Sequence, residues 1–364
     1  MVSPVLIDAS NLHALARGCA VMGSGGGGDP DIGLIMALRA VEEHGPVMVV
    51  GLDELPGDAL IMPCGLIGAP TVAIERVWNG DEGRMLCEVV EQLRGERVSA
   101  LMPYEIAGSN GLLPVTWAAR LGLPIVDADG MGRAFPEMQQ QAMHLAGVSA
   151  SPIVLTDGRG NTVILRATDN AWAERLARGG AASLGGVCAG ALYCMSADQA
   201  RTAAIGGSVS RAIKLGEAMR TRGADGRLPV IADALGGVVL IEGKVLDVER
   251  RTDGGFVRGS ATVEGTGSNT GRELRLELQN EFLIAMEDGT VRAAVPDIIS
   301  VLASDAGDPI VTERLRYGQR VTVIASPGPE VWWSPAGLAI VGPAAFGYDV
   351  EYAPISRGSV DAAV

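Results

Sequence analysis

The chain has 364 residues and a formal net charge of −14, and 48% of its residues are hydrophobic. Since single hydrophobic cores stop growing at roughly 250 residues, this length predicts two domains. The negative charge would repel a nucleic-acid backbone, and aromatic residues that could stack on bases make up only 4% of the chain. No apolar stretch reaches the roughly 18 residues of a membrane-spanning helix. We therefore expect a small polar molecule as ligand, and neither a nucleic acid nor a membrane.

The cysteines and the first residues bear on the compartment. The opening MVSPVLIDASNLHALARG has no basic segment, and Asp8 interrupts its apolar run, so it does not resemble a secretory signal peptide. Five cysteines are odd in number and form no C-x-x-C pair, which argues against structural zinc and a disulfide framework. A cytoplasmic location, where thiols stay reduced, is the expectation.

The N-terminal part alternates helix-like and strand-like segments. Residues 10–22 indicate a helix with Ser10 as its cap, and Asp29 followed by Pro30 begins a second helix, which Gly45 ends. Short apolar runs typical of buried strands occur at 47–52, 59–63, 98–102 and 124–126, with helices expected at 82–94 and 112–121. This alternation favours an α/β domain whose parallel or mixed sheet is covered by helices on both faces.

The pattern changes after about residue 150. Residues 153–155 and 162–165 flank the turn Asp157-Gly158 and predict a hairpin, and a helical stretch follows at 197–222. From Leu228 onward, short β-rich runs recur between turn signals, at 238–241, 256–263, 274–278, 282–286, 321–324 and 338–341. We therefore expect an α/β domain over residues 1–166. A β-rich domain over residues 167–364, a barrel or sandwich with a helical insertion, should follow it.

A glycine tract occupies residues 23–28, between the first two expected helices. Its G-x-G-x-x-G spacing is that of a dinucleotide fingerprint, but a helix-like segment precedes it where that fingerprint requires a strand. A flexible turn between helices is the other interpretation. Four consecutive glycines exceed what a turn requires and leave backbone N–H groups bare at a helix start, where they could hold an anionic or carbonyl oxygen. Asp29 disfavours a free anion there, so we expect a neutral or metal-carrying ligand to contact Gly25, Gly26, Gly27, Gly28 and Asp29.

Polar residues follow two of the expected strands. Glu105, Ser109 and Asn110 lie just past residues 98–102, whereas Asp127, Asp129 and Arg133 lie just past residues 124–126. The segment between the strands is long enough for the right-handed crossover that makes them parallel, so both loops should open onto one crevice.

Crowded carboxylates at such a crevice repel one another. A divalent cation or Arg133 could offset the repulsion, or one carboxyl group could keep a proton and act in acid–base catalysis. We therefore assign Glu105, Asp127 and Asp129 as candidate catalytic residues, with Ser109, Asn110 and Arg133 as candidate ligand contacts. The alternative is that Asp127 and Asp129 only cap turns and Arg133 neutralises them.

Two cysteines are also candidates. Cys64 follows a strand in MPCGLIGAP, and Cys188 lies in GGVCAGA, each among small residues that leave room for a ligand. Facing thiols can act as acid and base in racemisation, and Cys64 is included among the candidate catalytic residues on this ground. The other interpretation is that both are buried as small hydrophobic residues.

Several of these segments resemble the S-methyl-thiohydantoin desulfurase-like family, long known only as a domain of unknown function. They are GSGGGGDP (23–30), PCGLIGAP (63–70), LPIVDADGMGRAFPE (123–137), GGVCAGALYCMSA (185–197) and WWSPAGLAIVGPAAFGYD (332–349). The resemblance implies an N-terminal α/β domain, a β-rich C-terminal domain and a link to hydantoin-type ring metabolism, beside hydantoinase/oxoprolinase-type proteins. Members often have E-x-G-G-N where this chain has EIAGSN at residues 105–110, so the loop before Asn110 differs.

Three functional hypotheses remain open at this point. The first is an enzyme, a hydrolase or desulfurase, that acts on a hydantoin, a thiohydantoin or a related cyclic amide. The second is a thiol-dependent isomerase or racemase that uses Cys64 and Cys188. The third is a non-catalytic binding subunit of a hydantoinase-type complex. We also expect the chain to form a homo-oligomer.

Overall fold

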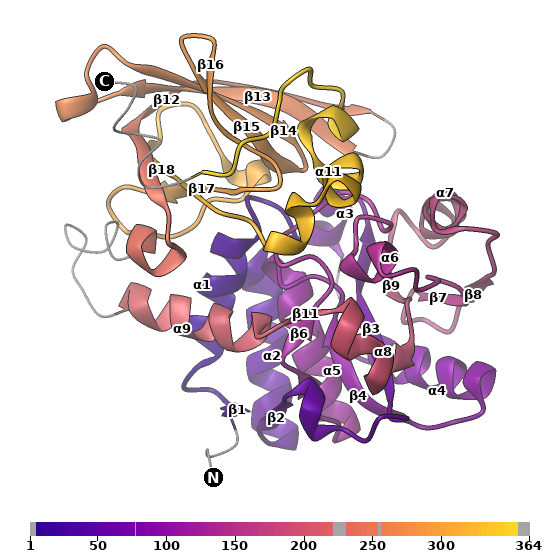
Figure 1. Cartoon of the computed structure of the whole chain (residues 1–364). Coiled ribbons are helices and arrows are strands. Elements are labelled where there is room, and N and C mark those ends of the chain that lie inside the picture. The colour runs from indigo at the N-terminus through magenta and orange to yellow at the C-terminus, as the bar shows by residue number, and fades with distance from the viewer. Residues whose placement is uncertain (1–4, 77, 221–230, 254–255, 356–364) are drawn as a thin grey trace.

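A computed structural model describes residues 5–76, 78–220, 231–253 and 256–355 of the chain. As Figure 1 shows, an α/β domain comes first, and a β-rich domain built from the later part of the chain packs over one end of it. Both predicted fold classes are confirmed: the first domain has a mixed sheet, and the second has an antiparallel sheet curved into a half-barrel with helices beside it.

Within the described residues, nine strands form the sheet of the first domain, in the order β1-β2-β5-β4-β3-β9-β7-β8, with β10 pairing with β3. The neighbours β2, β5, β4 and β3 are parallel, as the sequence predicts for the strands around residues 98–103 and 125–126. The outer strands are antiparallel to their neighbours. The strands are β1 (Val5–Ile7), β2 (Val47–Val50), β3 (Leu60–Gly68), β4 (Val98–Pro103), β5 (Ile125–Val126), β7 (Ile153–Thr156), β8 (Thr162–Leu165), β9 (Val187–Ala191) and β10 (Met195–Ser196).

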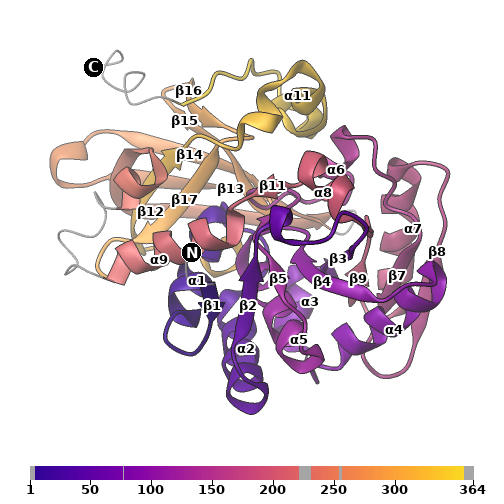
Figure 2. The ribbon, with the colours of Figure 1, turned by 60° about the horizontal axis from the view of Figure 1, so that its bottom comes forward.

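Helices cover both faces of this sheet. In Figure 2, α2 (Pro30–His44), α4 (Glu82–Arg94) and α5 (Leu113–Leu121) lie on one side, and α6 (Ala142–Leu145) and α8 (Ala197–Ala203) lie on the other. Side chains of β3 alternate between the two cores: Met62 and Cys64 pack with the first group of helices, and Ile61 and Ile67 pack on the opposite face. Also present are α1 (Leu12–Met22), α3 (Pro70–Glu75), α7 (Asn170–Ser183), α9 (Ser208–Arg220) and the short pair β6 (Ala128–Asp129) and β11 (Ile205–Gly206).

The second domain is built on an antiparallel sheet with the order β16-β15-β14-β13-β12-β18-β17, seven strands in the described part of the chain. Its buried side chains form a separate core that includes Leu276, Phe282 and Val323. The strands are β12 (Val238–Asp253), β13 (Phe256–Gly265), β14 (Glu273–Gln279), β15 (Glu281–Glu287), β16 (Thr290–Ala294), β17 (Ile298–Ala303) and β18 (Arg320–Ser326).

Some local predictions are wrong. Residues 338–341 form the end of helix α11 (Pro335–Val341), because the Ser334 hydroxyl caps it by accepting a hydrogen bond from Gly337 N (3.0 Å) and Pro335 suits a first turn. The helical stretch at 197–222 is interrupted between α8 and α9 by β11, which pairs with β6. Helix α7 was missed, although Asp169 caps it by accepting a hydrogen bond from Trp172 N (2.8 Å).

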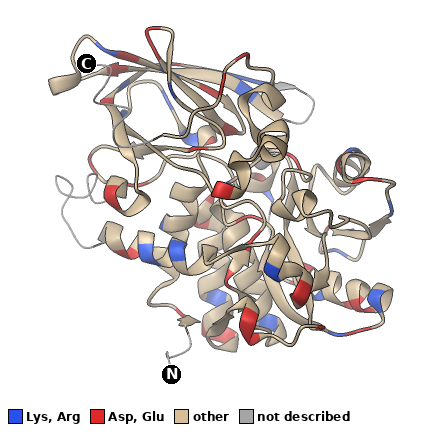
Figure 3. Cartoon of the chain, viewed as in Figure 1, with Lys and Arg blue, Asp and Glu red and all other residues tan. Residues whose placement is uncertain are grey.

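The charged residues are spread over both domains. Figure 3 shows acidic and basic positions interspersed along helices and strands of each. Within the described residues, no helix is both long and apolar enough to cross a membrane.

Helix α1, which leads into the glycine tract, is held against α9 by two glycines. A Cβ atom on Gly18 would lie 1.9 Å from Ala212 O, and one on Gly216 would lie 1.8 Å from Ala14 O. Neither distance is compatible with a real side chain, so the two helices approach this closely only because both positions are glycine.

We expect Gly216→Ala to lower the free energy of unfolding by about 1–3 kcal/mol or more, because the methyl group would push α9 away from α1. Gly179→Ala in α7 is the matched control: no atom lies within 4 Å of its added Cβ, and alanine is the better helix former, so stability should rise or stay unchanged. Thermal unfolding of the two variants measures this. If Gly216→Ala and Gly179→Ala have equal melting temperatures, the packing of α1 against α9 accommodates the added methyl group and the prediction is wrong.

Candidate functional site

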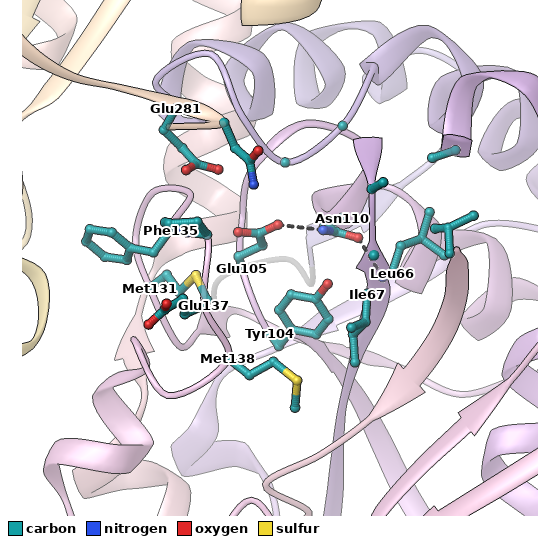
Figure 4. Close-up of a pocket in the computed structure, with 18 of the residues that line it drawn as sticks. Leu66, Ile67, Tyr104, Glu105, Asn110, Met131, Phe135, Glu137, Met138 and Glu281 are labelled. Carbon is teal, nitrogen blue, oxygen red and sulfur yellow. Dashed lines mark hydrogen bonds between the residues drawn. The ribbon is translucent and has the colours of Figure 1, made fainter. Parts of the chain in front are cut away.

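A cavity of about 90 Å³ lies at the carboxyl ends of β3 and β4, between the two domains. One ordered water needs roughly 10–15 Å³, so the cavity can hold a small molecule. The first domain contributes Leu66, Tyr104 and Glu105 to its wall, and the second contributes Glu281 (Figure 4). Asn280 of the second domain also lines the cavity. The carboxyl ends of parallel strands are where α/β proteins bind ligands, and the second domain closes this edge.

Glu105 lies two residues past the end of β4 and is buried. Its Oε1 accepts a hydrogen bond from Asn110 Nδ2 (2.5 Å), and Asn110 Oδ1 in turn accepts one from Leu66 N (2.7 Å) (Figure 4). Burial raises the pKa of Glu105 to about 8, and the hydrogen bond from Asn110 opposes that rise. Such a carboxyl group can exchange a proton near neutral pH, which general acid–base catalysis requires.

The glycine tract passes beside this carboxyl group. Gly27 and Gly28 line the cavity, and both have positive φ (82° and 81°), as does Gly25 (85°). Asn110 N donates to Gly27 O (3.2 Å), and Ser109 N donates to Gly28 O (3.3 Å). The Ser109 hydroxyl donates to Asp29 O. The tract therefore holds the loop that carries Asn110, and its own backbone forms part of the cavity wall.

Gly25 and Gly26 face the second domain. A Cβ on Gly25 would lie 2.6 Å from the Phe282 ring, and one on Gly26 would lie 2.3 Å from Glu281 Oε1. Asp29 caps α2 by accepting a hydrogen bond from Asp31 N (3.0 Å) and forms an ion pair with Arg314 of the second domain.

Glu281, at the start of β15, is a site residue that the sequence analysis missed. It is buried, lines the cavity, and follows Asn280, which has a positive φ of 56°. Burial and the nearby Glu105 raise the pKa of Glu281 well above its ordinary range. In the sequence, Glu281 is the first residue of the apolar run EFLIA, a pattern that predicts a strand and does not mark a site.

Arg133 is fully buried between the domains. Its guanidinium donates to the carbonyl oxygens of Ala134 (2.9 Å), Phe282 (3.3 Å) and Asp297. Burial lowers the pKa of Arg133 to about 10, and the charges of Glu281, Asp297 and Glu105 oppose this decrease. The arginine therefore lies close enough to both cavity glutamates to stabilise negative charge there.

Neither Asp127 nor Asp129 is among the residues that line the cavity. Asp129 Oδ2 accepts hydrogen bonds from Ile106 N (2.9 Å) and Gly132 N (2.7 Å), and Oδ1 accepts one from the Ser208 hydroxyl (2.5 Å). Burial raises the pKa of Asp129 to about 6. It thus positions the backbone next to Glu105. Asp127 Oδ1 accepts from Ser210 N (2.9 Å) in the first turn of α9, and the structure does not bring Asp127 to the cavity wall.

The cysteines are buried apart from one another. Cys64 packs in the core on one face of the sheet, and Cys188 packs in the core on the other face. Burial raises the pKa of Cys188 to about 12 and that of Cys64 well above its ordinary range, so both are held as neutral thiols. This arrangement does not present two facing thiols to a ligand.

Four buried polar atoms in the cavity wall lack a hydrogen-bond partner within the described part of the chain: Oε2 of Glu105, Oε2 of Glu281, and both Nε2 and Oε1 of Gln141. Gln141, which the sequence analysis also missed, is fully buried. Buried polar atoms without partners are costly, so a polar ligand in this cavity would relieve that cost. Among the residues that the structure describes, no group of three or more His, Cys, Asp or Glu side chains is placed to hold a metal ion.

Comparison with known proteins covers nearly the whole chain. Residues 10–167 match the family described as S-Me-THD-like, N-terminal domain, and residues 168–355 match S-Me-THD-like, C-terminal domain. A crystal structure of a protein from Chromobacterium violaceum superposes with a TM-score of 0.78 and 24% sequence identity, over 97% of this chain and 100% of the other. At that identity the likeness shows a shared fold. No protein of curated function matches.

The raised pKa of Glu105 predicts how stability depends on pH. An unfolded glutamate ionises near pH 4.3, whereas folded Glu105 keeps its proton up to about pH 8. Its stabilising contribution is therefore complete below about pH 4.3 and is lost as the pH rises to about 8. Glu105→Gln should make the melting temperature decline less between pH 5 and pH 8. The exposed Glu42→Gln on α2 is the control and should follow the wild type. Identical declines in all three proteins would contradict the buried, protonated state.

Proposed function

Because the chain belongs to the S-Me-THD-like family, we propose that it is an enzyme that adds water to a ring carbon of a hydantoin-like cyclic amide. The substrate class is that of S-methyl-thiohydantoins and related hydantoins. The cavity between the domains is the active site, with Glu105 as a catalytic residue and with Asn110, Gly27, Gly28 and Gln141 around the ligand.

The observation that carries this proposal is the set of unpartnered polar atoms in the cavity wall. Two carboxyl groups and one carboxamide offer both donors and acceptors within a small, mostly apolar space. A hydantoin-type ring has N–H donors and carbonyl acceptors around its edge, and its faces are flat. It would satisfy these atoms and pack against the glycine backbone, where side chains would otherwise intervene.

The carboxyl groups also supply the chemistry of hydrolysis. In an S-methyl-thiohydantoin, one ring carbon carries the methylthio group and is double-bonded to nitrogen. An ionised carboxylate takes a proton from water as the water oxygen bonds to this carbon, and a neutral carboxyl group gives its proton to the ring nitrogen. The carbon–sulfur bond then breaks. Methanethiol leaves with the proton from the first carboxyl group, and the second regains a proton from the new hydroxyl group, which becomes the hydantoin carbonyl.

The isomerase and binding-subunit hypotheses each require a different arrangement of residues. A thiol-dependent isomerase would need Cys64 and Cys188 at one ligand, and their burial on opposite faces of the sheet does not support it. A non-catalytic binding subunit would use the same cavity to bind a ring without converting it. A hydantoinase-type partner, a homo-oligomer and a cytoplasmic location stay predictions.

We expect the purified protein to release methanethiol from an S-methyl-thiohydantoin, detected with a thiol reagent, with the hydantoin product followed by chromatography. Glu105→Gln should lower kcat/KM by about 10²- to 10⁴-fold, the usual contribution of one general acid–base group. Cys64→Ala tests the thiol hypothesis, and loss of turnover in that variant alone would favour it. Tight binding of the ring without any product would instead favour the binding-subunit hypothesis.

Gln141→Met should separate binding from stability. Methionine has a similar length but no hydrogen-bonding amide, so the buried polar atoms that lack partners disappear and the free protein should gain up to about 1–3 kcal/mol of stability. Hydantoin binding, measured by calorimetry, should weaken because the ring loses its partners. If stability drops and affinity is unchanged, Gln141 has a structural role only.

A further inference from the structure

Glu105 and Glu281 extend into one cavity from different domains. Figure 4 shows Glu105, which follows β4, and Glu281, which begins β15, on the same side of the cavity. The two residues are 4% and 3% exposed, and each has one carboxyl oxygen without a partner in the described chain. Carboxyl groups that are close together and away from water resist simultaneous ionisation.

The charges around the pair leave room for one negative charge rather than two. Arg133 favours ionisation of both glutamates, and it donates to main-chain carbonyl oxygens. Arg178, which also lines the cavity, forms an ion pair with Glu174. Asp129 lies on the side of Glu105 and Glu313 lies on the side of Glu281, so both of these neighbours disfavour further ionisation. Asp297 and Tyr352 face Arg133 from the second domain, and Tyr104 lies beside Glu105.

The hydrogen bonds distinguish the two glutamates. Asn110 Oδ1 accepts from Leu66 N, so the other end of this amide must be its NH₂ group, which donates to Glu105 Oε1. A donated hydrogen bond favours the ionised form of Glu105. Glu281 Oε2 has no such donor, and its Oε1 lies against the backbone of Gly26. The negative charge is therefore better placed on Glu105 and the proton on Glu281.

We propose that Glu105 and Glu281 form a catalytic pair in which Glu105 loses its proton first and is then the base that activates water, while Glu281 keeps its proton and is the acid that protonates the ring nitrogen. This assignment rests on the proposed function for its substrate. The active site is then complete only when the second domain is in place. Gly26 is a positioning residue, since any side chain there would collide with the carboxyl group of Glu281.

The pairing is tested without substrate, by ¹³C NMR titration of the protein labelled at glutamate carboxyl carbons. Comparison of the wild type with Glu105→Gln and Glu281→Gln assigns the two late-titrating signals. Glu105→Gln should lower the pKa of Glu281 by at least about one unit, because it removes the neighbouring negative charge. Glu281→Gln should change the pKa of Glu105 little, because Glu281 is still protonated when Glu105 ionises. The exposed Glu42→Gln should shift neither. An unchanged Glu281 pKa in Glu105→Gln would overturn the pairing.

The roles are tested by the dependence of turnover on pH. Glu281→Gln should lower kcat by at least about 10²-fold and remove the fall in rate at high pH, since that fall reports loss of the acid's proton. Glu105→Gln should remove the rise in rate with pH that reports ionisation of the base. The proposal would be overturned if Glu281→Gln removed the rise in rate and Glu105→Gln removed the fall, or if Glu281→Gln kept full activity. Coupled titrations in a protein that turns over no ring would refute the proposed function and leave the pairing intact.

If either glutamine variant fails to fold, Gly26→Ala gives the same information by displacing the carboxyl group of Glu281 while keeping both glutamates. We expect it to lower the pKa of Glu281, because its carboxyl group moves away from the negative charge of Glu105, and to reduce kcat more than it raises KM. An unchanged Glu281 titration in a folded Gly26→Ala protein would contradict the pairing.

Discussion

Main-chain hydrogen bonds between the glycine tract and the second domain hold the two walls of the cavity together. Phe282 N donates to Ser24 O (2.7 Å), and Thr312 N donates to Gly25 O (3.0 Å). The Ser24 hydroxyl accepts from Ile299 N (3.1 Å). Because the same tract also bonds to the loop that carries Asn110, one short segment fixes the positions of residues from both domains. Glycine is required there because the backbone of Ala107 in the first domain and the side chains of Phe282 and Glu281 in the second approach the tract more closely than a Cβ would allow.

The electrostatics of the cavity follow from this arrangement. Sealing one domain over the carboxyl ends of the strands removes Glu105 and Glu281 from water, and Arg133 is the buried cation close to both. Unpaired buried charge is costly, so the free energy of the fold depends on where protons reside in this cavity. In the proposed enzyme, the same property that lowers stability at higher pH would give the carboxyl groups proton affinities suited to acid–base catalysis near neutral pH. Stability and chemistry are linked through one set of residues.

The family match and the cavity both involve the two domains. The family match extends over both domains, and the cavity draws its wall from both. The sheet of the first domain also takes in β9 and β10, which lie beyond the end of the N-terminal match. The two parts of the chain are therefore intertwined at the level of the sheet as well as at the site.

The sequence by itself determined the α/β class, the parallel pairing of the central strands and the cap of α2 at Asp29. These follow from local patterns: short apolar runs, helix periodicity, and a capping residue followed by proline. It also predicted that Glu105, Asn110 and the glycine tract lie near one another, because loops after parallel strands converge at one edge of a sheet. The structure brings these residues together.

Only the tertiary structure decided which other residues join them. Glu281 and Gln141 are far from Glu105 in the chain, and nothing local marks them, because their role comes from which domain surface packs over the sheet edge. Asp127 and Asp129 looked equivalent to Glu105 by position, yet β6 and α9 direct them to backbone N–H groups and a serine hydroxyl. Cys64 and Cys188 were separated by the alternation of side chains across a sheet, which depends on strand register. Register and domain packing are long-range properties, so a single sequence read locally does not reveal them.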